Sequence, residues 1–229
     1  MIDGFSSLVH LQHLDVQTMK LTANNQFYEC STGGFSGATL PHLQHLTSLT
    51  ARLSVENLQQ LGELSCLQQL SFAVDGNVAI GPSHVPGLAF PASLTYLGIG
   101  SDTEAGVLSL VPTGLRGLWL ERVADGPVEG PSSLLYCMSQ LQHLTMLSVK
   151  CSSSLNWPAA SSAYSALTAS SNLADMRLYR CNLPKGVWPH VWSAARKQPH
   201  LARLTFSPAD PNAVDMAVWG ATDMYSLVS

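Results

Sequence analysis

The histidines are the first residues whose spacing could support chemistry. The segment HLQHL occurs at residues 10–14 and again at 42–46, and QHL occurs at 142–144. Two histidines three residues apart can ligate zinc when further Cys, His or carboxylate ligands complete the site. No cluster of cysteines or carboxylates accompanies either copy, so we predict that the protein has no metal site. We expect His13 and His45 to lie near each other in neighbouring structural units.

The sequence also offers weak candidates for nucleophilic catalysis. Ser36 lies in GGFSGA (33–38), one residue short of the GxSxG pattern that exposes a catalytic serine between a strand and a helix. Glycine-rich phosphate loops of the GxxxxGK[ST] type are absent, and the carboxylates are scattered rather than paired for acid–base work. We therefore predict a flexible loop around Ser36, no catalytic residue, no cofactor and no enzymatic activity.

The cysteines are odd in number and include no CxxC pair. This usage indicates reduced thiols in an intracellular protein rather than a disulfide framework. We expect Cys66 and Cys137 on buried faces, whereas Cys181 occupies a turn position. The five cysteines are Cys30, Cys66, Cys137, Cys151 and Cys181.

The elements that position these residues follow from an internal repeat. The pattern Leu-x-x-Leu-x-apolar occurs in eight copies. In one of them methionine takes the place of the second leucine. The eight copies are Leu11–Leu14–Val16, Leu46–Leu49–Ala51, Leu67–Leu70–Phe72, Leu94–Leu97–Ile99, Leu115–Leu118–Leu120, Leu144–Leu147–Val149, Leu173–Met176–Leu178 and Leu201–Leu204–Phe206.

The spacing of the repeat predicts stacked parallel strands. The middle anchors are separated by 21 to 35 residues, with an average of about 27. Residues two apart in a strand face the same side, so the second and third anchors of each copy point together into a core that the neighbouring copies cover. The long first interval predicts a looped insertion over 22–38, and the second copy can also be read one step earlier, at Leu46.

The cleanest copy carries a family resemblance. The segment NLADMRLYRCNLP (172–184) matches LxxLxLxxCxLP without a gap. The chain resembles leucine-rich repeat proteins of the ribonuclease-inhibitor-like kind over roughly residues 5 to 210. The resemblance implies an α/β solenoid of about eight repeats over 1–210. Its curved parallel sheet would line the concave side, short helices and irregular coil the convex side, and residues 211–229 would form a C-terminal tail or irregular cap.

The resemblance is specific for fold and leaves several functions open. Similar proteins act as intracellular adaptors, ubiquitin-ligase substrate receptors, sensors in immune receptors and components of the ciliary axoneme. No helix cluster of the F-box type and no nucleotide-binding domain is recognisable, which favours a stand-alone scaffold or a fragment of a longer repeat protein. The resemblance implies a cytoplasmic location, including the cytoskeleton of the axoneme.

The segments between the strands predict a mixed convex side. We expect helices over 131–143, beginning near Pro131, over 158–169, and over 186–197 after Pro189, with irregular coil over 76–93. In the family a polar residue five positions after the middle anchor bonds the turn. That position is polar in five copies and apolar at Met19, Val123 and Ala209, where we expect looser turns.

The concave face holds the candidate binding residues. It is formed by the residues one before, one after and three after each middle anchor. Aromatic residues and arginine, which dominate binding hot spots, concentrate in its C-terminal half. Trp119 is the key residue, because we expect it on an exposed strand face. The other reading is that it lies under a side chain of a neighbouring copy. The predicted contact set is Tyr96, Trp119, Glu121, Lys150, Arg177, Tyr179 and Arg203.

Composition and charge narrow the partner classes. Hydrophobic residues make up 46% and charged residues 11% of the 229 residues, and the net charge is −4. No run reaches the ~18 apolar residues of a membrane span, and the N-terminal residues do not resemble a signal peptide. Residues 150–203 hold seven Lys or Arg and one acid, a net charge of +6. We therefore expect a protein partner, with an acidic ligand or nucleic acid at 150–203 as the alternative.

Overall fold

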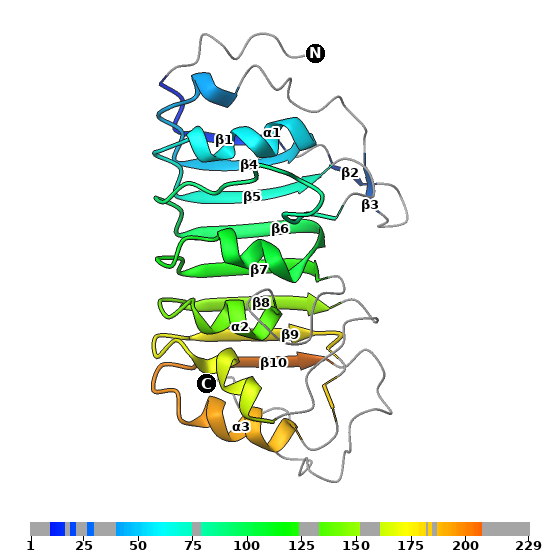
Figure 1. Cartoon of the computed structure of the whole chain (residues 1–229), viewed down its shortest axis with the longest axis vertical. Coiled ribbons are helices and arrows are strands. Elements are labelled where there is room, and N and C mark those ends of the chain that lie inside the picture. Colours follow the sequence, from blue (N-terminus) through cyan, green and yellow to red (C-terminus); the bar gives the residue numbers. More distant parts are fainter. Residues whose placement is uncertain are drawn as a thin grey trace.

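A computed structural model describes most of the chain from His10 to Ser207. The described residues are 10–16, 19–21, 27–29, 40–74, 79–123, 133–151, 161–181, 183–184 and 187–207. Their main element is one parallel sheet whose strands follow chain order (Figure 1). Two further short strands, which lie in the sequence between the first and second strands of this sheet, form a separate antiparallel pair.

The sheet contains eight strands stacked along the long axis of the molecule (Figure 1). One strand and the segment that returns to the next strand together form a coil. The strands are β1 (His13–Val16), β4 (Ser48–Leu53), β5 (Gln69–Val74), β6 (Tyr96–Thr103), β7 (Gly117–Val123), β8 (Met146–Cys151), β9 (Asp175–Tyr179) and β10 (Arg203–Ser207).

The strand register aligns the predicted anchors across the sheet. Every middle anchor is paired with the middle anchor of the neighbouring strand, so that the eight anchors form one continuous row across the sheet. Leu49 pairs with Leu14 and with Leu70, which excludes the alternative reading of the second copy at Leu46. The complete row is Leu14, Leu49, Leu70, Leu97, Leu118, Leu147, Met176 and Leu204.

The anchors form the core. Burial alternates along β4 and β9, because successive side chains of a strand point to opposite faces. Leu49, Leu97 and Leu118 are fully buried. Removing one such side chain from water contributes about 1.5–3 kcal/mol, so the leucine row stabilises the sheet substantially. Leu14 and Leu204, at the two ends of the row, are only partly buried.

The helices lie on one side of the sheet (Figure 1). They close the buried face, and α2 contacts η4 and η5 while η5 also contacts α3. In the described residues the opposite face has no helix over it. The elements are η2 (Leu40–His42), α1 (Val55–Gln60), η3 (Leu61–Glu63), η4 (Ala105–Leu110), α2 (Leu134–Ser139), η5 (Ser161–Thr168) and α3 (Trp188–Arg196).

The helices expected between the strands are present at the predicted places, but their boundaries differ from the prediction. Helix α2 begins three residues after Pro131, because Ser133 is its N-cap and accepts a hydrogen bond from the Tyr136 amide. Helix α3 begins at Trp188, with Pro189 in its first turn. The described part of 76–93 has no helix or strand, apart from one isolated bridge between Ile80 and Thr103.

One expectation about loops needs correction. The region predicted as a looped insertion contributes a strand, β3 (Phe27–Glu29), which pairs antiparallel with β2 (Met19–Leu21). Val123 ends β7, where it pairs with Cys151 after a shift in register and is fully buried. The turn expected to be loose after it lies outside the described residues. Ala209 and the proposed cap at 211–229 lie outside the described residues.

Candidate functional site

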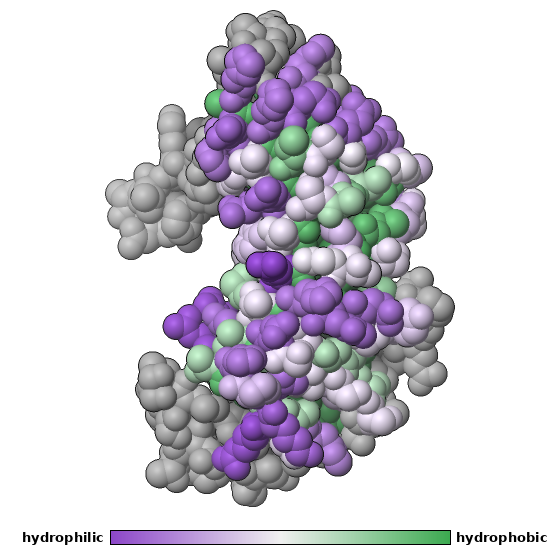
Figure 2. Space-filling view, turned by 90° about the vertical axis from the view of Figure 1, so that its left-hand side faces the viewer, coloured by the Kyte–Doolittle hydropathy of each residue, from purple (hydrophilic) through white to green (hydrophobic). Residues whose placement is uncertain are grey.

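The open face of the sheet is the surface that the sequence predicted as a binding site. We use "open face" for the side of the sheet opposite the helices. In Figure 2, the margin of the molecule opposite the helices is hollowed. Two rows of paired positions cross its C-terminal half, namely Tyr96–Gly117–Met146–Asp175–Arg203 and Gly98–Trp119–Ser148–Arg177–Thr205.

Trp119 lies on the open face between small residues. Its strand neighbours in the row are Gly98 and Ser148. A Cβ built on Gly98 would lie 3.2 Å from Trp119 Cε3, and one built on Gly100 would lie 3.9 Å from Cζ3. The indole ring therefore leans across the two glycines of β6. It is partly exposed, and it lies against these two glycines.

Tyr96 repeats this arrangement in the opposite direction. A Cβ on Gly117 would lie only 2.6 Å from Tyr96 Cδ2, so the phenol ring occupies the space above that glycine. Each of the two neighbouring strands thus supplies an aromatic ring and a glycine that receives the ring of the other strand. Partial burial raises the pKa of Tyr96 above its ordinary value. The result is an apolar aromatic platform at the middle of the open face.

The aromatic platform depends on Gly117. We expect Gly117→Ala to displace the Tyr96 ring, because 2.6 Å is shorter than any normal carbon–carbon contact, and to lower the free energy of unfolding by about 1–2 kcal/mol. Urea denaturation measures this change. Gly114→Ala is the matched control, because nothing lies within 4 Å of its added methyl group. Equal stability of the two variants would contradict the described packing.

Ion pairs lie on the C-terminal side of the platform. Lys150 of β8 donates a hydrogen bond to the Glu121 carboxylate of β7. Asp175 receives two hydrogen bonds from Arg177, at 3.0 Å from Nε to Oδ1 and 2.6 Å from Nη2 to Oδ2. Arg203 Nη1 lies 3.5 Å from the same carboxylate. Asp175 therefore fixes two arginines of neighbouring strands.

The pairing orients Arg177. A bidentate contact between a guanidinium and a carboxylate fixes both the position and the plane of the guanidinium. The hydrogen bonds that Arg177 donates to Asp175 also raise the pKa of Arg177 above its ordinary value. The side chain of Arg177 thus keeps its charge on the open face, two strands from Trp119.

Ion pairs neutralise several of the cations that an acidic ligand would need. The predicted net charge of +6 over 150–203 does not lie on one surface. Three of its cations, Lys150, Arg177 and Arg203, face Glu121 and Asp175 on the open face. Arg196 and Lys197 lie at the end of α3, beyond the other face of the sheet. The open face is therefore nearly balanced in charge.

All seven predicted contact residues lie on five consecutive strands, β6 to β10. Tyr96, Trp119, Glu121, Lys150, Arg177 and Tyr179 are partly exposed, and Arg203 is exposed. Sequence reasoning placed Asp175 on this face but missed its role as the shared carboxylate. It also missed the ion pair of 2.8 Å between Arg122 Nε and Asp102 Oδ1. Opposite charges at equivalent positions of neighbouring copies were the signal for Asp175 and Arg203. The pair of Asp102 and Arg122 had no such signal, because they pair only after a shift in register.

A cluster of Ser83, His84 and Glu104 contains the residue types of a hydrolase triad. The Ser83 hydroxyl and His84 Nδ1 both contact the same Glu104 oxygen, and Ser83 Oγ lies 3.3 Å from Nδ1. In a triad the imidazole lies between the hydroxyl and the acid, with one nitrogen facing each. Here Nδ1 faces both, so the cluster lacks the geometry for proton transfer from serine through histidine.

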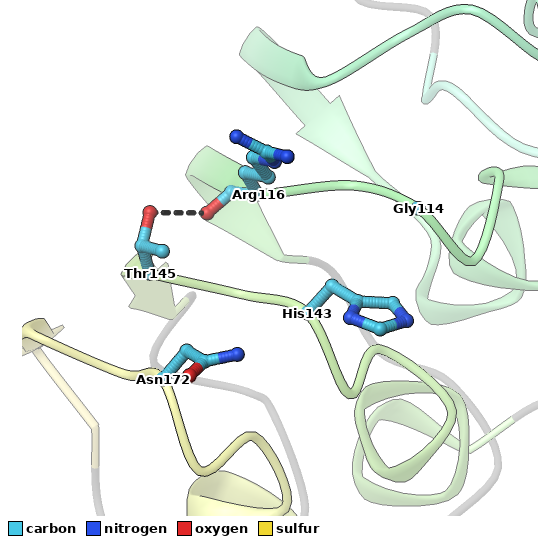
Figure 3. A pocket seen from close by; sticks show the side chains of 5 residues that line it. All are labelled: Gly114, Arg116, His143, Thr145 and Asn172. Carbon is cyan, nitrogen blue, oxygen red and sulfur yellow. Dashed lines mark hydrogen bonds between the residues drawn. The ribbon is translucent and has the colours of Figure 1, made fainter.

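A hollow of about 450 Å³ lies at the edge of the sheet where strands β7 to β9 begin. The Thr145 hydroxyl is already committed, because it donates a 3.0 Å hydrogen bond to the Arg116 carbonyl. Figure 3 shows the Arg116 side chain extending away from His143 and Asn172. These groups do not converge on one point, so the hollow has no arrangement suited to catalysis.

The histidine expectation is corrected by the strand register. The ring of His10, rather than that of His13, stacks on His45, with centroids 5.9 Å apart. The pairing of Leu14 with Leu49 places residues 35 apart side by side, whereas the two HLQHL segments are offset by 32. Within the described ranges no three His, Cys, Asp or Glu side chains gather as metal ligands. Cys66, expected in the core, is exposed, whereas Cys137 is buried.

Comparison with known proteins adds no assignment. No protein-family model matches the chain, and no curated protein matches it. Among the described residues no helix is long and apolar enough to cross a membrane.

Proposed function

We propose that the chain is a leucine-rich repeat solenoid of the ribonuclease-inhibitor-like kind that binds another protein through its open face. The proposed role is that of a non-catalytic scaffold. The leucine anchors supply the rigid support, because they place β6 to β10 in a fixed register. The side chains on the open face are then free to vary without disturbing the core.

The observation that carries the proposal is the environment of Trp119. A tryptophan in a core is buried, and one on an ordinary protein surface is uncommon because its exposed apolar area is unfavourable. Trp119 instead lies on a platform with Tyr96, two strands from the ion-paired Arg177. A rigid aromatic centre with a charged rim resembles the organisation of protein-binding hot spots.

The test is capture of partners with a double variant. We expect Trp119→Ala combined with Tyr179→Ala to reduce the captured amount of specific partners at least about 30-fold, because hot-spot residues contribute about 2 kcal/mol or more each. Quantitative mass spectrometry of proteins retained by the immobilised wild-type and variant chains measures this ratio.

Tyr136→Ala is the matched control. Tyr136 is half-exposed on α2, which lies on the helical side of the sheet. We expect this variant to retain the same partners as the wild type. If the double variant captured every partner as well as the wild type did, the open face would not be the binding surface. Circular dichroism verifies that both variants remain folded.

The same proposal includes a cytoplasmic location, which the odd number of cysteines without a CxxC pair supports. A role in a larger assembly, such as an axonemal complex or a substrate receptor, is compatible with a scaffold. The charge-balanced open face supports a protein partner over nucleic acid, because phosphate recognition needs an excess of unpaired cations.

A further inference from the structure

Two buried thiols meet between neighbouring coils. Cys151 is the last residue of β8, and Cys181 lies two residues beyond the end of β9. Their Sγ atoms are 2.7 Å apart, only about 0.7 Å longer than a disulfide bond. The two side chains are 2% and 1% exposed. Closing the bond between them therefore requires a small movement of two sulfur atoms.

The backbone brings Cys181 to this position. Lys150 pairs with Tyr179, so regular pairing would place Arg180, and not Cys181, beside Cys151. The chain changes direction at Arg180, whose φ of 55° makes it the only non-glycine residue with positive φ among those described. A left-handed conformation is unfavourable for arginine, so the surrounding structure must maintain it. The outcome is that Cys181 faces the core and Cys151.

We propose that Cys151 and Cys181 are a redox-active pair that forms a reversible disulfide between consecutive coils by exchange with a low-molecular-weight disulfide such as oxidised glutathione. This assignment is independent of the proposed function. The pair is a free dithiol in the structure.

The disulfide forms in two thiol–disulfide exchange steps. One protein thiol loses its proton, and the thiolate attacks a sulfur of the small disulfide, releasing one small thiolate that takes up the proton. The second protein thiol then loses its proton and displaces the other small thiolate from the mixed disulfide. Two protein thiols are oxidised to one disulfide, and one small disulfide is reduced to two thiols.

Burial slows this exchange. The hydrogen bond with Cys181 and the apolar surroundings raise the pKa of Cys151, so little thiolate exists in the closed structure. Both cysteines lie where the chain leaves the strands, and strand ends open locally more easily than strand centres. We expect oxidation through such opening, and hence more slowly than at the exposed Cys66.

The experiment uses the full-length chain in buffers of reduced and oxidised glutathione. Peptide mass spectrometry after alkylation is expected to detect one linked peptide pair containing Cys151 and Cys181. The link closes a loop of about thirty residues, so the Tm should rise by about 5–10 °C and return after reduction.

Single variants separate this pair from the other thiols. Cys151→Ser and Cys181→Ser should each abolish both the linked peptide and the shift in Tm, while Cys66→Ser and Cys137→Ser should retain them. The proposal is overturned if Cys151 and Cys181 remain reduced when Cys66 is fully glutathionylated, or if the rise in Tm survives both Cys151→Ser and Cys181→Ser. The mass measurement on the wild-type chain decides the case even if a variant fails to fold.

Discussion

Leu118→Ala is expected to lower the free energy of unfolding by about 3–5 kcal/mol. Leu118 is fully buried and paired with Leu97 and Leu147 in the middle of the sheet. Truncation removes the buried methyl groups and leaves a cavity that neighbouring coils cannot fill, because their own anchors are fixed by the strand register. Urea denaturation followed by circular dichroism measures the change.

Leu204→Ala is the matched control for this prediction. Leu204 occupies the same position in the repeat, but it lies in the last described coil and is only partly buried. We expect its truncation to cost about 1–2 kcal/mol, less than half of the effect at Leu118. Similar losses at the two positions would show that the repeat position alone, and not coverage by neighbouring coils, determines stability.

The second large effect is a loss of stability at alkaline pH. The pKa of Cys151 is raised in the folded state by the Cys181 thiol and by burial. Above pH of about 8.5 the unfolded chain releases this proton and the folded chain retains it, so unfolding becomes more favourable as the pH rises. At pH 10 this difference should have removed about 2 kcal/mol of folding stability.

Comparison of variants isolates this contribution. Under reducing conditions, the free energy of unfolding of Cys151→Ala should fall by about 2 kcal/mol less between pH 8 and pH 10 than that of the wild type. Cys66→Ala should follow the wild type, because Cys66 is exposed. Equal slopes for all three proteins would mean that Cys151 ionises as readily in the folded chain as in the unfolded chain.

The periodicity of leucine predicted the sheet well because it reflects a simple steric rule. Anchors such as Leu97 and Leu118 must face the same side in every copy, so their spacing fixes the strands, their register and the buried face together. The helices were less predictable. The boundary of α2 depends on the hydrogen bond between Ser133 and Tyr136, and Pro131 suggested an earlier start.

The candidate site was predictable in its membership but not in its contacts. Alternation along each strand places Trp119 and Arg177 on the open face whatever their partners are. Their partners depend on which coil lies beside which, and that information is absent from a single copy of the repeat. The glycines that receive Trp119 and Tyr96, and the carboxylate that Arg177 shares with Arg203, became evident only when the coils were aligned.

The same limit applies to the cysteines and histidines. Sequence spacing suggested that Cys66 was buried and that His13 approached His45. The register instead leaves Cys66 exposed and stacks His10 on His45. Side-by-side positions are set by the separation of anchors in consecutive copies, and a loop of variable length between them hides this separation from inspection of short motifs.

Hydroxyl-radical footprinting of the folded chain tests most directly whether a leucine-lined core lies beneath an open binding face. One experiment measures the solvent accessibility of side chains on both faces of the sheet. After normalisation to the intrinsic reactivity of each residue type, Leu97, Leu118 and Leu147 should be strongly protected, whereas Trp119 and Tyr179 on the open face should react readily. Oxidation of the three leucines as rapid as that of Trp119, or protection of Trp119 equal to that of Leu118, would contradict a leucine-lined core beneath an open binding face.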